Sequence, residues 1–261
     1  MVVITSDQRD VIFDAVRTMY TAVADQPEQE YHFPTGRRAL DYVGYPPEYL
    51  DRLPAAAIES FAGVGYPFAA EVLRTGDTVV DIGSGSGTDL LLAAQLVGPE
   101  GYAVGIDMTA AMRQKCLATA RSAGLINVDV LEGNAESIPL PDASVDVVTS
   151  NGVINLVPDK RAAIAEIHRV LRPGGRVQLA DIVVTDLPSA ACRAKPQLWA
   201  ECIVGATTDI DYLDMFRAAG FAEVDELSGL DYFAASTSDS TRQTARGFGA
   251  HSMVMRAVKP G

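Results

Sequence analysis

The sequence predicts an α/β fold in which helices cover both faces of a doubly wound, mostly parallel sheet, and three adjacent features carry this prediction. The β-branched run TVVDI at 78–82 indicates a short buried parallel strand. Glycines then occupy the alternate positions Gly83, Gly85 and Gly87, and the apolar run LLLAA at 90–94 begins a helical pattern. A strand, a glycine turn and a helix form the first half of a nucleotide-binding βαβ unit, because glycines permit a tight turn and a close backbone approach to a ligand.

The spacing and charge of the turn indicate which ligand it binds. The dinucleotide fingerprint is G-x-G-x-x-G, whereas 83–87 follow G-x-G-x-G, and Asp81 places a carboxylate where a pyrophosphate would be repelled. A ligand with a cationic amino acid end and no phosphate fits this charge better, and S-adenosylmethionine (SAM) is such a ligand. The next apolar run, 102–106, ends in Asp107. An acidic side chain about 20 residues beyond the turn is placed to accept hydrogen bonds from ribose hydroxyls.

Five segments, in order over roughly 100 residues, resemble those of class I SAM-dependent methyltransferases. These segments are 81–87 (DIGSGSG), 105–108 (GIDM), 133–136 (GNAE), 150–156 (SNGVINL) and 171–175 (LRPGG). Within that class the chain resembles the arsenite methyltransferases and, more distantly, the ubiquinone and menaquinone methyltransferases. The resemblance implies a seven-stranded, Rossmann-like sheet with the strand order 3-2-1-4-5-7-6, SAM as the cofactor and S-adenosylhomocysteine as its product.

The cofactor site that this resemblance implies can be written residue by residue. The backbone of the glycine turn would border the methionine part of SAM, with Asp81 near its ammonium group. Asp107 would take the ribose hydroxyls, and Met108 would lie flat against adenine. Asn151 ends the fourth strand and is expected beneath the transferable methyl, because ligands bind at the carboxyl ends of parallel strands. The expected cofactor-binding residues are Asp81, Gly83, Gly85, Gly87, Asp107, Met108, Asn134, Ala135 and Asn151.

Asn134 departs from the pattern of the family. Relatives often carry an aspartate at this position, where it faces the adenine amine. An amide oxygen can accept the same hydrogen bond, so Asn134 remains a candidate for this role. The alternative is that Asn134 and Glu136 are ordinary turn residues.

The rest of the chain alternates predicted helices and strands. Met112 and Cys116 share one face of a helix at 109–123, which makes Cys116 a small core residue rather than a reactive thiol. A polar patch at 236–241 (STSDST) is expected to be an exposed loop. Further helices are predicted at 159–171, at 186–205 as an insertion and at 209–219, and further strands at 128–131, within 142–150, and at 176–184, 222–227 and 251–258, the last antiparallel.

The amino-terminal part precedes the nucleotide-binding unit and has a different character. An amphipathic helix is predicted at 7–25, whereas 26–54 is irregular and rich in prolines and aromatic residues. This stretch either forms a lid over the site, as in the family that the chain resembles, or covers an apolar surface. We therefore expect a helical lid segment at 1–72 and a methyltransferase domain at 73–261, with a substrate-cap insertion at about 186–220.

Composition and charge limit the partners. The 261 residues are 48% hydrophobic and 21% charged, which is typical of a soluble globular protein. A formal net charge of −13 argues against nucleic acid and anionic membranes as partners, because phosphates require a basic face. The three scattered cysteines do not suggest a disulfide framework, and the sequence shows neither a signal peptide nor a run of about 18 apolar residues. We expect a cytoplasmic enzyme that acts on a small molecule; the sequence leaves the oligomeric state open.

The cysteine positions separate this chain from the arsenite methyltransferases that it resembles. Those enzymes hold As(III), a soft centre, with cysteine thiolates before the first strand, after the fourth strand and in the inserted helix. This chain has Val64 and Gly152 at the first two positions, and only Cys202 matches. Because one thiolate cannot chelate As(III), we expect an organic acceptor. Cys202 is then either a small apolar residue of the inserted helix or a residue that lines the pocket.

Two alternatives stay open. One is a methyltransferase for arsenite or another metalloid that uses Cys202 with Cys192 or with a glutathione thiol. The other is a SAM-binding protein that does not methylate. No catalytic residue is assigned: the candidates are His32, Asn151 and Cys202, with His32 as the histidine considered for a general base. A base is needed only if the nucleophile arrives protonated, and no metal site is predicted.

Overall fold

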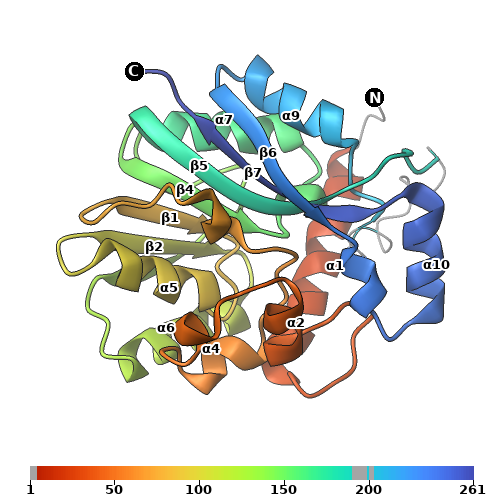
Figure 1. Ribbon diagram of the computed structural model, residues 1–261, viewed down its shortest axis with the longest axis horizontal. Helices are drawn as coiled ribbons and strands as arrows, with labels where there is room; N and C mark the ends of the chain where they lie inside the picture. The colour runs from red at the N-terminus through yellow and green to blue at the C-terminus, as the bar shows by residue number, and fades with distance from the viewer. Residues whose placement is uncertain (1–4, 190–198, 200–202) are drawn as a thin grey trace.

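The computed structural model describes residues 5–189, 199 and 203–261, and its central feature is a seven-stranded sheet (Figure 1). The strand order is β3-β2-β1-β4-β5-β7-β6, as expected. Neighbouring strands are parallel except where β7 pairs with β5 and with β6. The predicted doubly wound, mostly parallel sheet is confirmed. Its strands are β1 (Thr78–Ile82), β2 (Tyr102–Asp107), β3 (Val128–Glu132), β4 (Val145–Asn151), β5 (Leu171–Val183), β6 (Ala222–Leu230) and β7 (His251–Val258).

The sheet changes its winding direction at β1. The strands β2 and β3 lie on one side of it, and β4 and β5 lie on the other. The carboxyl ends of β1 and β4 therefore form the topological switch point, where open α/β sheets bind their ligands. Val79, Val80 and Ile82 of β1 are at most 1% exposed, as the β-branched run predicts for a strand that is covered on both faces.

Helices cover both faces of the sheet, and the alternation of side chains along β1 divides the core between them. Val79 belongs to the cluster that contains α1 (Ser6–Asp25), α5 (Thr88–Val97) and α6 (Ala110–Ser122). Val80 belongs to a second cluster on the opposite face, with α7 (Lys160–Val170) and α9 (Asp209–Ala218). Met112 and Cys116 of α6 are buried in the first cluster, so the prediction of Cys116 as a core residue is confirmed. None of the helices within the described residues is long and apolar enough to cross a membrane.

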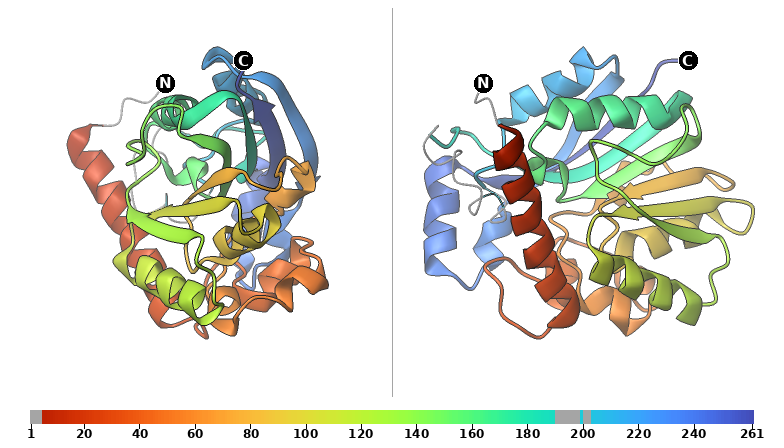
Figure 2. Two further views of the ribbon diagram at one scale, coloured as in Figure 1. Left: turned by 90° about the vertical axis from the view of Figure 1, so that its left-hand side faces the viewer. Right: turned by 180° about the vertical axis from the view of Figure 1, so that it is seen from behind.

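The amino-terminal segment begins with the predicted long helix and continues through short helices. Figure 2 shows α1 beside the carboxyl ends of the central strands. After it, prolines begin α3 (Pro47–Leu50) and η1 (Pro67–Ala70), because a proline is favourable in a first helical turn. The remaining short helices are α2 (Gly36–Tyr42) and α4 (Ala55–Glu59).

Side chains tie the middle of this segment to the carboxyl-terminal part of the chain. The Tyr42 hydroxyl donates to the Asp231 carbonyl at 2.6 Å, and the Arg38 guanidinium donates to the Ala235 carbonyl at 3.1 Å. The Ser236 hydroxyl donates to the His32 carbonyl at 2.5 Å. Residues 32–42 are therefore held against η4 (Tyr232–Ala235), about 200 residues away in sequence but adjacent in space.

Two sequence predictions differ from the structure. The patch at 236–241 is not simply an exposed loop: the Ser238 hydroxyl accepts a hydrogen bond from the Thr241 amide at 3.2 Å and caps α10 (Asp239–Phe248). The strand predicted at 176–184 begins earlier, at Leu171, because the LRPGG stretch pairs at its first residue with Val145 across a bulge. The helix predicted at 186–205 falls mostly outside the described residues, and its described end at 203–205 forms a turn.

Candidate active site

The glycine turn between β1 and α5 adopts the conformation that its sequence predicts. Gly83, Gly85 and Gly87 have φ angles of 74°, 52° and 99°, in the left-handed region that favours glycine. A Cβ on Gly83 would lie 2.3 Å from a methyl of Val153, and one on Gly87 would lie 2.7 Å from the sulfur of Cys116. A side chain at either position would therefore displace a neighbour, whereas a Cβ on Gly85 would meet only the Gly83 carbonyl at 3.9 Å, an ordinary contact.

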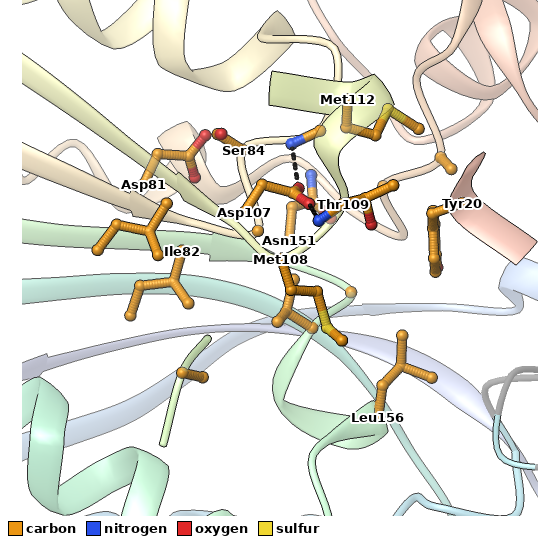
Figure 3. A pocket seen from close by; sticks show the side chains of 18 of the residues that line it. Tyr20, Asp81, Ile82, Ser84, Asp107, Met108, Thr109, Met112, Asn151 and Leu156 are labelled. Atoms are coloured by element: carbon orange, nitrogen blue, oxygen red, sulfur yellow. Dashed lines mark hydrogen bonds between the residues drawn. The ribbon is translucent and has the colours of Figure 1, made fainter. Parts of the chain in front are cut away.

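A cavity lies in front of this turn, at the carboxyl ends of β1, β2 and β4 (Figure 3). It is open to solvent on one side, and about 940 Å³ of space, solvent at its mouth included, lies between its walls. Gly87 caps α5 and is not among the lining residues, although it was predicted to border the cofactor. The other expected cofactor-binding residues all line the cavity: Asp81, Gly83, Gly85, Asp107, Met108, Asn134, Ala135 and Asn151.

Asp107 joins the end of β2 to the glycine turn. Its carboxylate accepts hydrogen bonds from the amides of Gly85 at 2.9 Å and Thr109 at 2.7 Å, and both bonds are drawn in Figure 3. Burial raises the pKa of Asp107, and these two amides oppose that effect. A carboxylate can accept about four hydrogen bonds, so the Asp107 oxygens keep acceptor capacity toward the cavity.

Asp81 is the second carboxylate of the cavity, and its surroundings differ from those of Asp107. It is 2% exposed, and within the described part of the chain no hydrogen bond lowers the pKa of its carboxyl group. Burial raises its pKa well above the ordinary value, and repulsion by Asp89 and Asp107 adds to the effect. A buried carboxylate without a partner is unfavourable, so a cation would be stabilised beside Asp81.

Asp89 is a third lining carboxylate, and the sequence prediction missed it. It lies in the first turn of α5, where the helix dipole favours an anion. Its two oxygens accept hydrogen bonds from the Tyr45 hydroxyl and, at 3.0 Å, from the Asn151 amide. The sequence does show an acidic residue directly after the glycine turn, which could have been predicted to line the site. Nothing in the sequence indicates that Tyr45 lies beside this residue.

Asn151 lies at the end of β4, as predicted, but its side chain forms hydrogen bonds to other residues of the protein. Its amide oxygen accepts hydrogen bonds from the backbone of Val64 at 2.7 Å and Gly65 at 3.2 Å. Its amide nitrogen donates to the Gly65 carbonyl at 2.9 Å as well as to Asp89. The side chain thus ties Val64 and Gly65 to the edge of the sheet.

Asn134 and Glu136 have bonds of the kind expected of turn residues. The amide oxygen of Asn134 accepts a hydrogen bond from the Glu136 amide at 2.9 Å. Glu136 accepts a bond from the Asp159 amide at 2.7 Å and forms an ion pair with Arg9 of α1. Asn134 and Glu136 thus form hydrogen bonds typical of turn residues, which was the alternative prediction. Asn134 and Ala135 also line the cavity.

Of the two remaining catalytic candidates, His32 and Cys202, only His32 lies within the described residues, and it does not line the cavity. The His32 ring packs edge-on against Phe33, with ring centres 4.6 Å apart, and it is not among the lining residues. Cys202 and Cys192 lie outside the described residues. Val64 and Gly152, in contrast, converge: a Cβ on Gly152 would lie 3.2 Å from a methyl of Val64.

The cavity has two ends of different chemistry. We call Asp81, Asp89 and Asp107 the acidic end. The apolar end consists of Phe13, Val16 and Tyr20 from α1 with Leu156 and Val157 from the segment after β4. Figure 3 places Asp81 on one side of the view and Tyr20 and Leu156 on the other. Among the described lining residues there is no lysine, arginine or histidine, and the described chain holds no group of three or more His, Cys, Asp or Glu side chains suited to a metal ion.

Comparison with known proteins decides the family. Residues 73–220, more than half of the chain, match the family model described as a methyltransferase domain. The chain belongs to this methyltransferase family. The resemblance inferred from the five sequence segments is confirmed, and so is the fold that it implied.

Two kinds of curated relative match parts of this methyltransferase-family chain. An arsenite methyltransferase from Halobacterium salinarum is 40% identical over 163 residues, which cover 62% of this chain and 42% of the relative. A demethylmenaquinone methyltransferase from Listeria welshimeri is 33% identical over 116 residues, covering 44% of this chain and 49% of the relative. The chain thus spans less than half the length of these relatives.

Solved structures share the fold of this methyltransferase-family chain over a larger part of its length. An arsenic(III) S-adenosylmethionine methyltransferase from Chlamydomonas reinhardtii is 28% identical, with a TM-score of 0.64, and the match covers 87% of this chain and 75% of that one. A protein described as the [4+2]-cyclase SpnF is 19% identical, with a TM-score of 0.62 and coverage of 98% and 97%. At that identity the likeness concerns the fold alone.

Proposed function

We propose that this protein binds SAM and transfers its methyl group to a small organic acceptor. The observation that carries the proposal is the buried, unpartnered carboxylate of Asp81 in a cavity with two further carboxylates and no described basic side chain. SAM carries an ammonium and a sulfonium charge and no phosphate, so it matches this charge distribution, whereas a dinucleotide does not. When bound, SAM supplies an electrophilic methyl group on positively charged sulfur.

The lining residues would divide the cofactor among them. Asp81 would pair with the ammonium group, and the backbone of Gly83 and Gly85 would border the amino acid part. Asp107 would accept hydrogen bonds from the ribose hydroxyls with its remaining capacity. Met108 would pack against adenine, and Asn134 with Ala135 would border the same ring.

The reaction would depend on positioning and on exclusion of water. The apolar end offers rings and aliphatic side chains, which can hold an organic acceptor and keep water from the methyl group. None of the described lining residues at this end is a base. This arrangement suits an acceptor atom that arrives unprotonated, because a base is needed only if the nucleophile carries a proton.

Residues 1–72 would serve as the cover of the site, with 73–261 as the methyltransferase domain and about 186–220 as its substrate cap. The support comes from α1, whose Phe13, Val16 and Tyr20 lie on one face and form part of the cavity wall. The carboxyl end of α1 is held because the Ser60 hydroxyl donates to the Val23 carbonyl at 2.9 Å. Its amino end is joined to the β3–β4 loop by the pair of Arg9 and Glu136.

Arsenite is the alternative acceptor, because the named relatives include arsenite methyltransferases. The convergence of Val64 and Gly152 supports the organic acceptor instead. The resemblance puts two arsenic-binding cysteines at these positions, and here the facing pair offers one valine side chain and no sulfur. A soft metalloid would have to rely on Cys202 and on a thiol from solution.

The test begins with calorimetric titration of the full chain with SAM and with S-adenosylhomocysteine. We expect saturable binding of both. The protein is then incubated with SAM and panels of organic acceptors, and formation of S-adenosylhomocysteine is followed. Absence of SAM binding would contradict the proposal as a whole, whereas binding without turnover of any acceptor would favour the non-methylating alternative.

A further inference from the structure

Asp89 differs from the other lining carboxylates because two side chains from distant parts of the chain hold it. The Tyr45 hydroxyl donates to one oxygen, and the Asn151 amide donates to the other at 3.0 Å. The same amide lies 3.2 Å from the Tyr45 hydroxyl, so the three side chains form a closed set. Asp89 is 6% exposed and Tyr45 is 3% exposed, yet Asp89 lines the cavity and Tyr45 does not.

Both donors are fixed by their own surroundings. The Tyr45 ring packs edge-on against Phe61 and Tyr66, with ring centres 5.4 Å and 4.7 Å away. The Asn151 side chain is held by the backbone of Val64 and Gly65. Donors that cannot rotate away hold the carboxylate in one orientation, which is what a recognition site needs.

The hydrogen bonds also determine the charge of Asp89. Burial raises its pKa to about 6, and the bonds from Tyr45 and Asn151 oppose that rise. The two hydrogen bonds therefore favour the ionised form of Asp89, although it is buried beside two other carboxylates. Without the Tyr45 hydroxyl, less would oppose the effect of burial, and the protonated form of Asp89 would be favoured more.

We propose that Tyr45 is a positioning residue of the cofactor site, which acts through Asp89 by keeping that carboxylate ionised and directed at the positive charge of the cofactor. The inference rests on the proposed binding of SAM. Tyr45 belongs to the amino-terminal segment and does not line the cavity, so it acts on the cofactor only through Asp89. Cofactor affinity then depends on pH, and the Tyr45 hydroxyl sets the pH at which it falls.

Other ionisable groups face the three carboxylates, and they define what the test must control. In the described chain, the ionisable groups that interact electrostatically with these carboxylates include no histidine. They are the carboxylates themselves, two phenols, one thiol whose pKa is raised by burial, and one guanidinium near Asp107: Tyr45, Tyr66, Asp81, Asp89, Asp107, Arg113 and Cys116.

The experiment measures SAM affinity by calorimetry over roughly pH 5.5 to 8.5, spanning the pKa of Asp89, for the wild type and Tyr45→Phe. We expect near-equal affinities at the upper end and a several-fold weaker variant near pH 6.5. The fall in affinity should begin about one pH unit higher in the variant, the shift expected when a carboxylate loses one hydrogen bond. Tyr66→Phe is the matched control, because it removes a neighbouring hydroxyl that does not bond to Asp89.

The outcomes separate this inference from the proposed function. A loss of affinity that is the same at every pH indicates a purely structural role of Tyr45 and overturns the inference while SAM binding stands. An equal pH shift in Tyr66→Phe overturns it as well. Failure of the wild type to bind SAM at any pH overturns both proposals.

A second measurement needs no ligand. The carboxyl carbon of Asp89 is followed by NMR in the free protein as pH varies, with Asp89→Asn used to assign its signal. We expect the Asp89 pKa near 6 in the wild type and about one unit higher in Tyr45→Phe. An unchanged titration in the variant would count against the proposed role of the hydroxyl.

Discussion

The acidic end and the apolar end of the cavity are built by different parts of the chain. The acidic end comes from β1, β2 and the first turn of α5, which are contiguous over about 30 residues of one βαβ unit. The apolar end combines α1 with the segment after β4, more than a hundred residues apart. The comparison teaches that one short stretch of the chain supplies the three carboxylates of the acidic end, whereas the apolar end forms only when distant segments pack together.

The choice of acceptor is the strongest test of this comparison, because it concerns the presence or absence of turnover. If the apolar end holds organic molecules, arsenite with SAM and glutathione should give little or no methylated arsenic. The measurement detects methylated arsenic with the wild type and with Cys202→Ser. Rapid methylation that is lost in Cys202→Ser would overturn the prediction; slow methylation that persists in the variant agrees with it.

Removal of a carboxylate from the acidic end should weaken cofactor binding but leave the apolar end intact. Asp107→Ala is expected to lower SAM affinity by roughly 1.5–3 kcal/mol, about tenfold to 150-fold, as for a lost hydrogen bond to a charged group. Calorimetry checks the value. Asp129→Ala is the matched control, since this carboxylate lies exposed on the neighbouring strand β3. Equal affinities of Asp107→Ala and the wild type would remove Asp107 from the site.

The buried carboxylates should make the free protein more stable as pH falls from 7 to 5. The pKa of Asp89 is about 6 in the folded state and lower in the unfolded state, so the native state binds more protons in this window. The sign is therefore a gain in stability on acidification, on the order of 1 kcal/mol for this group. Denaturant unfolding at both pH values measures it.

Asp89→Asn provides the control for that pH dependence. The variant should lose the part of the stability gain that comes from Asp89. It should keep any part that comes from Asp181, because burial also raises the pKa of Asp181 to about 6. Saturating SAM should reduce the gain in the wild type, because a cation favours the ionised carboxylates. A stability that falls between pH 7 and 5 in the free wild type would contradict this account of the acidic end.

The smallest expected effect concerns the cover of the apolar end. If residues 7–50 move as a lid, their hydrogen exchange should slow when SAM and acceptor are bound. The structure narrows this expectation to the amino-terminal half of α1, since residues 32–42 are tied to η4. Arg9→Gln should raise exchange there by roughly fivefold, or about 1 kcal/mol, by breaking the pair with Glu136.

Arg17→Gln is the control for the cover, because Arg17 pairs with Asp14 on the exposed side of the same helix. It should leave exchange in α1 nearly unchanged. The carboxyl end of α1, held through Val23, should respond to neither variant. Exchange that is the same with and without cofactor and acceptor would rule out a moving cover.

Much of the fold was predictable, because it is encoded in short motifs. The β-branched run of β1, the three glycines and Asp107 each follow from local rules of strand burial, positive φ and chain direction. The missed helix α10 has a cap, Ser238, within a patch whose polar composition suggested a loop. Composition alone does not distinguish a capped surface helix from a loop, since both are polar.

The candidate site was predictable only in part. Asp81, Asp107 and Met108 line the cavity as expected, because a single unit places them at the ends of adjacent strands. The hydrogen bonds of Asn151 to residues 64 and 65, and those of Tyr45 and Asn151 to Asp89, had no sequence signal. They join positions separated by 44 to 87 residues, which no local pattern relates to one another.

By itself, then, the sequence determined the motifs by which the chain resembles the methyltransferase family and the carboxylates of the acidic end, since both depend on short stretches of neighbouring residues. The strand order followed from that resemblance. Tertiary structure alone decided that Tyr45 holds Asp89, that Val64 fills the space beside Gly152, and that α1 forms a wall of the cavity. These contacts arise from the packing of distant segments against one sheet edge. They stabilise the protein only once folding has brought those segments together.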